Sequence, residues 1–169
     1  MRTLKLVKYL VFITLVFFIT TGAEAQSKPP KFSDYPVKRV YKGKNAPIKL
    51  KRDDMAFRTR LRWAATHMRP NFAGHYIVTE WGCGAECRDG AVIDARTGKV
   101  STWDFTICCW PISRSDKFEP IEFRISSNLI VFTGLRNEKE GDNGKHFYKF
   151  QDRRFIFIRS VLDSSQTQQ

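Results

Sequence analysis

The sequence lacks the short motifs that mark the commonest classes of enzyme. None of the patterns G-x-S-x-G, H-E-x-x-H, G-x-x-x-x-G-K-[S/T] and G-x-G-x-x-G occurs in its 169 residues. These patterns provide a nucleophile elbow, a zinc site, a phosphate-binding loop and a dinucleotide-binding loop. Their absence removes positive support for the corresponding hydrolase, protease and nucleotide-binding functions. We therefore assign no catalytic residue and no cofactor, and we favour a non-enzymatic role.

The chain also lacks an apolar run long enough to cross a membrane. The run at residues 9–19 is about half as long as the roughly twenty residues that a spanning helix needs. Three basic residues precede it: Arg2, Lys5 and Lys8. The small-residue motif Ala23-Glu24-Ala25 follows it. This order is typical of a secretory signal peptide over residues 1–25, so we predict cleavage near Ala25-Gln26 and a periplasmic or secreted protein.

Acidic residues are scarce at the start of the predicted mature chain. Residues 26–52 contain nine Lys or Arg against Asp34 alone, whereas residues 53–169 carry 17 basic and 15 acidic residues. The basic segment also has four prolines and few large apolar residues, so we expect an extended or disordered, solvated arm. We predict a single domain over 53–162 and a polar tail over 163–169.

The charge of this arm limits its partners. Basic residues attract anionic cell-surface components such as lipid head groups, so we expect peripheral contact with a membrane surface. The same charge would attract nucleic acid, but export argues against nucleic acid as a partner.

Hydrophobic periodicity predicts one helix followed by seven strands. The helix begins at Asp53-Asp54, keeps apolar residues on one face from Phe57 to Met68, and ends before Pro70. The strands are rich in β-branched and aromatic residues and are predicted at 72–81, 90–95, 99–105, 121–126, 129–134, 146–150 and 154–161. Short connections favour antiparallel hairpins. We therefore predict an α+β domain, with one N-terminal helix packed on a curved, mainly antiparallel sheet of about seven strands.

Two of these strands, 129–134 and 154–161, are apolar on both faces. Strands of this kind usually lie inside a sheet whose two faces are both covered. Strand 121–126 instead alternates apolar and charged residues, which predicts one exposed face. We therefore expect 129–134 and 154–161 to be central strands.

Only four cysteines are present, and they form two pairs in the sequence. Cys83 and Cys87 lie in a loop between two predicted strands, and Cys108 and Cys109 are adjacent. An even number in an exported chain most simply predicts two disulfides. A bond between adjacent cysteines needs a strained eight-membered ring. We therefore favour one bridge within the Cys83 to Cys87 loop, or two cross-links from this loop to Cys108 and Cys109.

A metal or thiol-redox site is the alternative use of these cysteines. The C-x3-C spacing of Cys83 and Cys87 occurs at zinc sites, and His75 could join them as a ligand. Two observations oppose this hypothesis. An exported compartment oxidises thiols, and redox motifs ordinarily have C-x2-C at the start of a helix.

The segment around the first cysteine pair resembles a known group of sequences. The matching motifs are Asn71-Phe72-Ala73-Gly74-His75-Tyr76, Trp81-Gly82-Cys83-Gly84 with Cys87, Ala91-Val92-Ile93-Asp94 and Thr97-Gly98-Lys99-Val100. This segment is similar to a family of small exported bacterial proteins with the pattern NFAGHY…WGCGxxC…TGKV. The resemblance implies a bacterial, periplasmic protein whose distinctive element is a glycine-bounded cysteine loop. It supplies no catalytic residues, and Cys108-Cys109 has no place in the pattern.

Aromatic and arginine side chains near the cysteines favour a binding function. Such residues dominate binding hot spots, and a disulfide-fixed loop lowers the ordering cost of binding. We therefore hypothesise an exported binding module, of the inhibitor or immunity type, that presents the loop from Trp81 to Cys87 to an envelope protein. The candidate loop contacts are Trp81, Gly82, Gly84 and Glu86, and the further candidates for ligand contact are His75, Arg58, Arg62, Trp103 and Trp110. His75 is also suited to a structural role, because a buried imidazole needs a hydrogen-bond partner.

Overall fold

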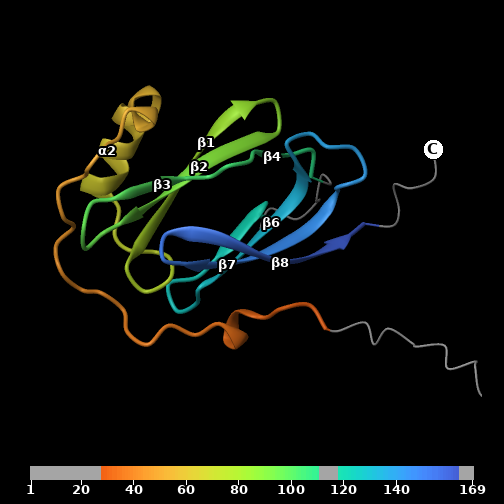
Figure 1. The fold of residues 1–169 in the computed structure, drawn as a ribbon, viewed down its shortest axis with the longest axis horizontal. Coiled ribbons are helices and arrows are strands. Elements are labelled where there is room, and N and C mark those ends of the chain that lie inside the picture. The colour runs from red at the N-terminus through yellow and green to blue at the C-terminus, as the bar shows by residue number, and fades with distance from the viewer. Residues whose placement is uncertain (1–27, 111–117, 164–169) are drawn as a thin grey trace, which may run out of the picture.

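The computed structural model describes residues 28–110 and 118–163. The predicted signal peptide and most of the predicted polar tail lie outside these ranges. Within them, one short α-helix accompanies an eight-stranded antiparallel sheet, so the fold belongs to the α+β class (Figure 1). In this described part of the chain, no helix has the length and apolar character needed to cross a membrane.

The elements follow the predicted order of helix before strands. The helical elements are η1 (Phe32–Asp34), η2 (Asp53–Phe57) and α2 (Arg58–His67). The strands are β1 (Tyr76–Gly84), β2 (Cys87–Asp94), β3 (Val100–Thr102), β4 (Ile107–Cys108), β5 (Ile121–Phe123), β6 (Leu129–Arg136), β7 (Gly144–Gln151) and β8 (Arg154–Leu162). The sheet is open and has the order β1-β2-β4-β6-β7-β8, with β3 beside β2 and β5 beside β6.

The helical segment begins at the paired aspartates, as predicted, but it begins as the 3₁₀ turn η2, and α2 starts at Arg58 without a side-chain N-cap. The Asp54 carboxylate accepts a hydrogen bond from the backbone N–H of Lys51 at 2.6 Å, and η2 leads directly into α2. Three apolar side chains of α2 pack against Ile77 of β1 and Ile93 of β2: Leu61, Ala64 and Ala65. This contact covers one face of the sheet at its β1 end.

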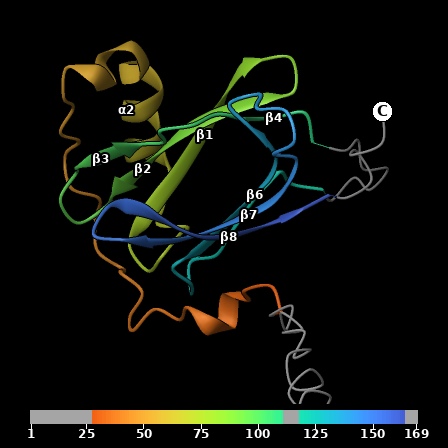
Figure 2. The ribbon, with the colours of Figure 1, turned by 45° about the vertical axis from the view of Figure 1, so that its right-hand side comes forward.

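Residues 28–52 are extended, but they are not the solvated tether that their composition predicted. Their backbone is tied to the domain at intervals, because Val37 N–H donates to the Ser126 carbonyl, Tyr41 N–H to Gly74 and Lys49 N–H to Gly98. Figures 1 and 2 show this segment, in orange, running along the lower side of the sheet and up towards α2. The prediction was wrong because the composition of the segment does not show that backbone carbonyls of the domain are available to accept its hydrogen bonds. All nine of its basic side chains are exposed.

Strands β1 and β4 differ from the prediction for local reasons. β1 begins at Tyr76 and not at residue 72, because Ala73 and Gly74 adopt φ values of 43° and 80° and form a tight turn. β4 is the strand missing from the prediction, because its two residues are too few to show a periodicity.

The two strands that are apolar on both faces occupy very different positions. β6 is central, as predicted, and its residues 129–134 are all buried. β8 lies at the edge of the sheet, and among the described strands it pairs only with β7. The prediction of a central position for 154–161 is therefore wrong, since the apolar outer residues of β8 are not covered by a further described strand.

Candidate functional site

The hairpin of β1 and β2 carries the first cysteine pair at its tip. Gly84 pairs with Cys87 across a two-residue turn, and a disulfide joins Cys83 to Cys87 with 5.1 Å between their Cα atoms. The structure therefore has the first of the two connectivities that the sequence favoured, a single bridge within the Cys83 to Cys87 loop. Residues 82–86 are exposed, so the tip presents a small, stapled surface whose only charged side chain is that of Glu86.

Trp81 does not belong to that exposed surface. Its side chain is 5% exposed and packs in the cluster beneath α2, where its ring stacks on Phe57 with 4.4 Å between the centroids. Residue alternation along β1 explains this orientation, because Trp81 shares the inward face with Ile77 while Glu80 points outward. The expectation that Trp81 contacts a ligand is wrong. The residue instead packs the hairpin against Phe57 and the helix.

Cys108 and Cys109 carry free thiols, so the expectation of two disulfides is wrong. The sheet explains the outcome. β4 places Cys108 opposite Cys87, whose sulfur is already bonded to Cys83, and Cys109 is the exposed residue that follows.

His75 lies at the opposite end of the hairpin from the disulfide. It precedes Tyr76, the first residue of β1, and the eight residue steps from there to Gly84 correspond to about 26 Å. His75, Cys83 and Cys87 therefore cannot bind one metal ion, and that form of the alternative hypothesis is wrong. Among residues 28–110 and 118–163, no group of three or more His, Cys, Asp or Glu side chains is placed to hold a metal.

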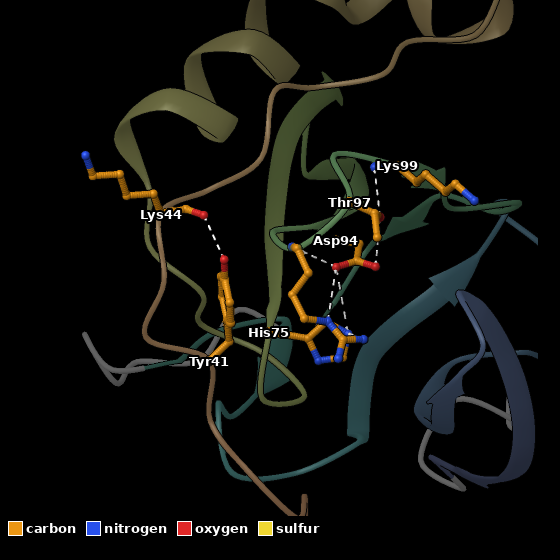
Figure 3. A network of polar contacts seen from close by, with 7 residues as sticks. Tyr41, Lys44, His75, Asp94, Thr97 and Lys99 are labelled. Carbon is orange, nitrogen blue, oxygen red and sulfur yellow. Dashed lines mark hydrogen bonds and ion pairs between the residues drawn. The ribbon is translucent and has the colours of Figure 1, made fainter.

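The contacts of His75 are those of a structural residue (Figure 3). Its Nε2 accepts a hydrogen bond from the Arg96 guanidinium at 2.7 Å and lies 3.8 Å from Oδ1 of Asp94. Burial, assisted by the positive charge of Arg96, lowers the pKa of His75. The imidazole is therefore held neutral, with Nε2 as acceptor.

Asp94 organises the turn that follows β2. Its carboxylate accepts hydrogen bonds from the Arg96 N–H and the Thr97 hydroxyl, both at 2.9 Å, and its backbone carbonyl accepts one from Gly98 at 2.8 Å. This is the role that an aspartate two residues before a Thr-Gly turn ordinarily has. In Figure 3, His75 and Thr97 both point toward the Asp94 carboxylate, whereas Tyr41 bonds separately to the carbonyl of Lys44 at 2.9 Å. The hydrogen bonds of this cluster explain why the turn is well formed.

The remaining predicted contact residues are scattered over the molecule. Trp103 is 6% exposed and packs edge-on against Phe132, so its assignment as a ligand contact is wrong and it belongs to the core. Trp110 is half-buried, with the Arg88 guanidinium 5.6 Å from its ring centre. Arg58 and Arg62 are exposed on α2. The structure does not bring these residues together into one site.

A surface that the sequence did not predict lies along β8. Seven large apolar side chains are exposed in the described part of the chain, and four of them belong to this one strand. They are Ile156 (47% exposed), Phe157 (50%), Val161 (42%) and Leu162 (52%). Successive residues of a strand point to opposite faces, so Ile156 and Phe157 lie on opposite faces of the sheet, as do Val161 and Leu162. We call these four side chains, which flank the open edge from both faces, the β8 edge surface. The signal was present as an apolar run, but only the strand order shows that the run lies at an edge.

A partly buried polar network fixes one part of the β8 edge surface. The Arg136 guanidinium donates to both Asp142 carboxylate oxygens, at 2.7 and 2.8 Å, and to the Tyr148 hydroxyl at 2.7 Å. Arg136 also lies 5.1 Å from the ring centre of Phe157. Its hydrogen bonds lower the pKa of Asp142, which keeps the carboxylate ionised. Phe157 is therefore held in place although half of it is exposed.

A groove of about 470 Å³ lies between the start of the basic segment and β5–β8. Its apolar lining includes Phe32, Phe147 and Val161, and its cationic lining includes Lys31 and Arg124. Positive charge of the arm therefore reaches the face of the sheet next to β8.

No protein-family model, no curated protein and no solved structure matches this chain. The class of the protein is therefore defined by its own features, as an α+β fold with an open antiparallel sheet, a stapled hairpin and an apolar edge strand. The resemblance of residues 71–100 to small exported bacterial proteins stays a prediction.

Proposed function

We propose that the protein is an exported binding module whose β8 edge surface takes up an extended segment of an envelope protein. The observation that carries this proposal is the concentration of exposed apolar side chains on one edge strand. Single exposed apolar residues are common on soluble proteins, but a gathered set usually marks an interaction site.

The edge position of β8 supports an extended partner. An edge strand offers backbone donors and acceptors in a row, and a peptide that adds to the sheet satisfies them while its alternate side chains contact the surface. Natural sheets usually protect long edges with charges, prolines or a covering element. β8 is nine residues long and has four exposed apolar side chains, so its two arginines, Arg154 and Arg159, protect the edge only in part.

Charge indicates what the partner segment contains. Residues 153–162 include Arg153, Arg154 and Arg159 and no acidic residue. A segment that alternates acidic and apolar side chains complements this strand. A second copy of the same chain fits less well, because residues 153–162 carry no acidic side chain to complement these arginines.

The stapled hairpin tip is the second surface that can contact the same partner. Residues 82–86 are exposed and fixed by the disulfide, which lowers the ordering cost of binding. If the module acts as an inhibitor, the tip is the element suited to enter a cleft of the partner, and the purified partner loses activity when the module is added.

Site-specific cross-linking tests the proposal. A photoreactive residue is placed at Ile156 in one variant and at Thr102, exposed on β3, in a matched control. We expect one envelope protein to be cross-linked from position 156 and not from position 102. Its linked peptide should be extended and rich in acidic and apolar residues, and its capture should fall at least about tenfold in I156E and R154E.

Three results would overturn the proposal. Equal cross-linking from positions 156 and 102 would show contact without a defined site. A cross-link between two copies of this chain, with a dimer that I156E dissociates, would make β8 a self-association strand. Full capture by both I156E and R154E would place the contact elsewhere, and G82A or E86A would then show whether it lies at the hairpin tip.

A further inference from the structure

Cys87 and Cys108 lie directly opposite each other on neighbouring strands. The register pairs Cys87 of β2 with Cys108 of β4, and the Cys109 N–H donates to the Glu86 carbonyl at 3.2 Å. A hydrogen bond between the flanking residues identifies a non-hydrogen-bonded pair, the position where facing side chains approach most closely. Cα atoms in such pairs are about 4.5 Å apart, which lies within the range that a disulfide spans.

The exposure of the four cysteines divides them into two kinds. Cys87 and Cys108 are 7% and 2% exposed and face the same side of the sheet, whereas Cys83 and Cys109 are exposed. Cys87 therefore has two cysteines within reach of its sulfur, Cys83 across the turn and Cys108 across the strand pair.

The backbone around this pair is unusual. Glu86 and Cys109, the two residues joined by the flanking hydrogen bond, have φ values of 48° and 54°. The left-handed region is uncommon for residues other than glycine, and such conformations gather at functional sites.

We propose that Cys108 is the internal exchange partner of the Cys83–Cys87 disulfide. The chain then switches between a form closed at the hairpin tip and a form cross-linked between β2 and β4. This inference goes beyond the proposed function and does not depend on the β8 edge surface or its partner.

The exchange needs no external oxidant. Cys108 loses its proton to solvent, and its thiolate attacks Sγ of Cys87. The bond between the sulfurs of Cys83 and Cys87 breaks, and its electron pair leaves on Cys83, which takes up a proton. Each form has one disulfide and two thiols. The new bond closes a longer loop than the old one, so it stabilises the folded state more strongly against unfolding. It leaves Cys83 and Cys109 as exposed thiols.

The surroundings of Cys108 set the rate of this step. Burial raises the pKa of its thiol to about 12, and the neighbouring Cys109 thiol and the negative charge of Glu138 act in the same direction. The thiolate is the attacking species, so exchange is slow at neutral pH. The rate should rise about tenfold for each pH unit between pH 7 and 9, because the thiolate fraction does so.

The variant C83S tests the geometry directly. It leaves Cys87, Cys108 and Cys109, and it is oxidised with glutathione disulfide before non-reducing peptide mapping. We expect a Cys87–Cys108 bond as the main product. A Cys108–Cys109 bond, a Cys87–Cys109 bond or glutathione adducts alone would overturn the proposal. Circular dichroism establishes that C83S is folded, and if it is not, the labelling experiment on the wild-type chain decides.

Thiol labelling of the wild-type chain follows the exchange itself. A pulse of iodoacetamide at pH 7 should label Cys109 and leave Cys83 unlabelled. After incubation at pH 9, a second, isotopically heavy pulse should label Cys83. C109S should keep this change and C108S should abolish it. Cys83 labelling in C108S, or none in the wild type and C109S, would overturn the proposal.

Discussion

The ring of Phe57 stacks on the ring of Trp81, which ties the turn before the helix to the strand that carries the disulfide. The centroids are 4.4 Å apart and Trp81 is 5% exposed, so the tryptophan stabilises the fold beneath the hairpin tip. This contact and the disulfide fix the two ends of the hairpin tip, and residues 82–86 are the ones exposed there to a partner.

W81A should therefore lower the stability of the domain, and it is not a variant that removes a partner contact alone. Truncating a buried aromatic side chain removes its burial and leaves a cavity, so we expect the free energy of unfolding to fall by about 3–5 kcal/mol in urea titrations. The control is W63A, because Trp63 is 57% exposed and its loss should cost about 0.5 kcal/mol or less. Equal stability of W81A and the wild type would contradict the account.

The free energy of unfolding should fall as the pH drops below 6.5. Burial lowers the pKa of His146 and of His75 from the ordinary value of 6.5. Below pH 6.5 the unfolded chain takes up protons that the folded chain does not, so stability is complete above this value and is lost as the pH falls. Each histidine contributes a slope of at most about 1.4 kcal/mol per pH unit.

The variant H146Q isolates one of these contributions. His146 is fully buried, with Nδ1 2.7 Å from the Ser160 hydroxyl and Nε2 2.9 Å from the Gly134 carbonyl, and a glutamine amide offers a similar donor and acceptor without titrating. Urea titrations between pH 7.5 and about 5.5 should show a flatter dependence in H146Q and the flattest in H75Q/H146Q. An unchanged slope in both variants would show that other groups cause the dependence.

Replacing Asp94 should loosen the turn between β2 and β3. Its buried carboxylate accepts two hydrogen bonds at 2.9 Å from Arg96 and Thr97. Hydrogen bonds to a charged group contribute about 1.5–3 kcal/mol, so D94A should lower the free energy of unfolding by an amount in that range or above. D94N keeps the acceptor oxygen and should cost less. A D94A variant as stable as D94N would show that the carboxylate is not needed in the turn.

The arm should bind anionic membranes without leaving the domain. Its nine basic side chains are exposed although its backbone is tied to the domain, so deleting residues 26–50 would damage the fold as well as remove charge. The variant K38Q/R39Q/K42Q/K44Q keeps the backbone. Since each basic residue near an anionic surface contributes about 1 kcal/mol before screening, its affinity for phosphatidylglycerol vesicles should fall more than about tenfold.

Salt and vesicle charge provide the controls for that measurement. Binding of the wild-type chain should weaken as salt is added and should be absent on uncharged phosphatidylcholine vesicles. Salt-insensitive binding, or equal binding by the four-residue variant, would exclude the arm as the contact.

The sequence predicted those parts of the fold that depend on local patterns. The helix after Asp53-Asp54, the central strand β6 and the antiparallel hairpins follow from hydrophobic periodicity and short connections. It could not predict that β8 lies at an edge, because an apolar run has the same composition whether a further strand covers it or not.

The candidate site shows the same division between local and long-range information. The disulfide at the tip was one of two favoured connectivities, and the turn role of Asp94 followed from its position before Thr97-Gly98. The pairing of Cys87 with Cys108 depends on the register between β2 and β4, which brings together residues 21 positions apart. The exposure of Trp81 was predicted wrongly because its aromatic character favours burial and binding alike.

Hydrogen exchange along β8 is the most direct test of whether this strand takes up the partner segment. The protein cross-linked from position 156 is purified, and amide exchange of this chain is compared with and without it. We expect slower exchange at alternate amides of residues 154–162, those that point away from β7, with no change in α2. Protection confined to the hairpin tip at residues 82–86, or to α2, with β8 unchanged, would contradict it.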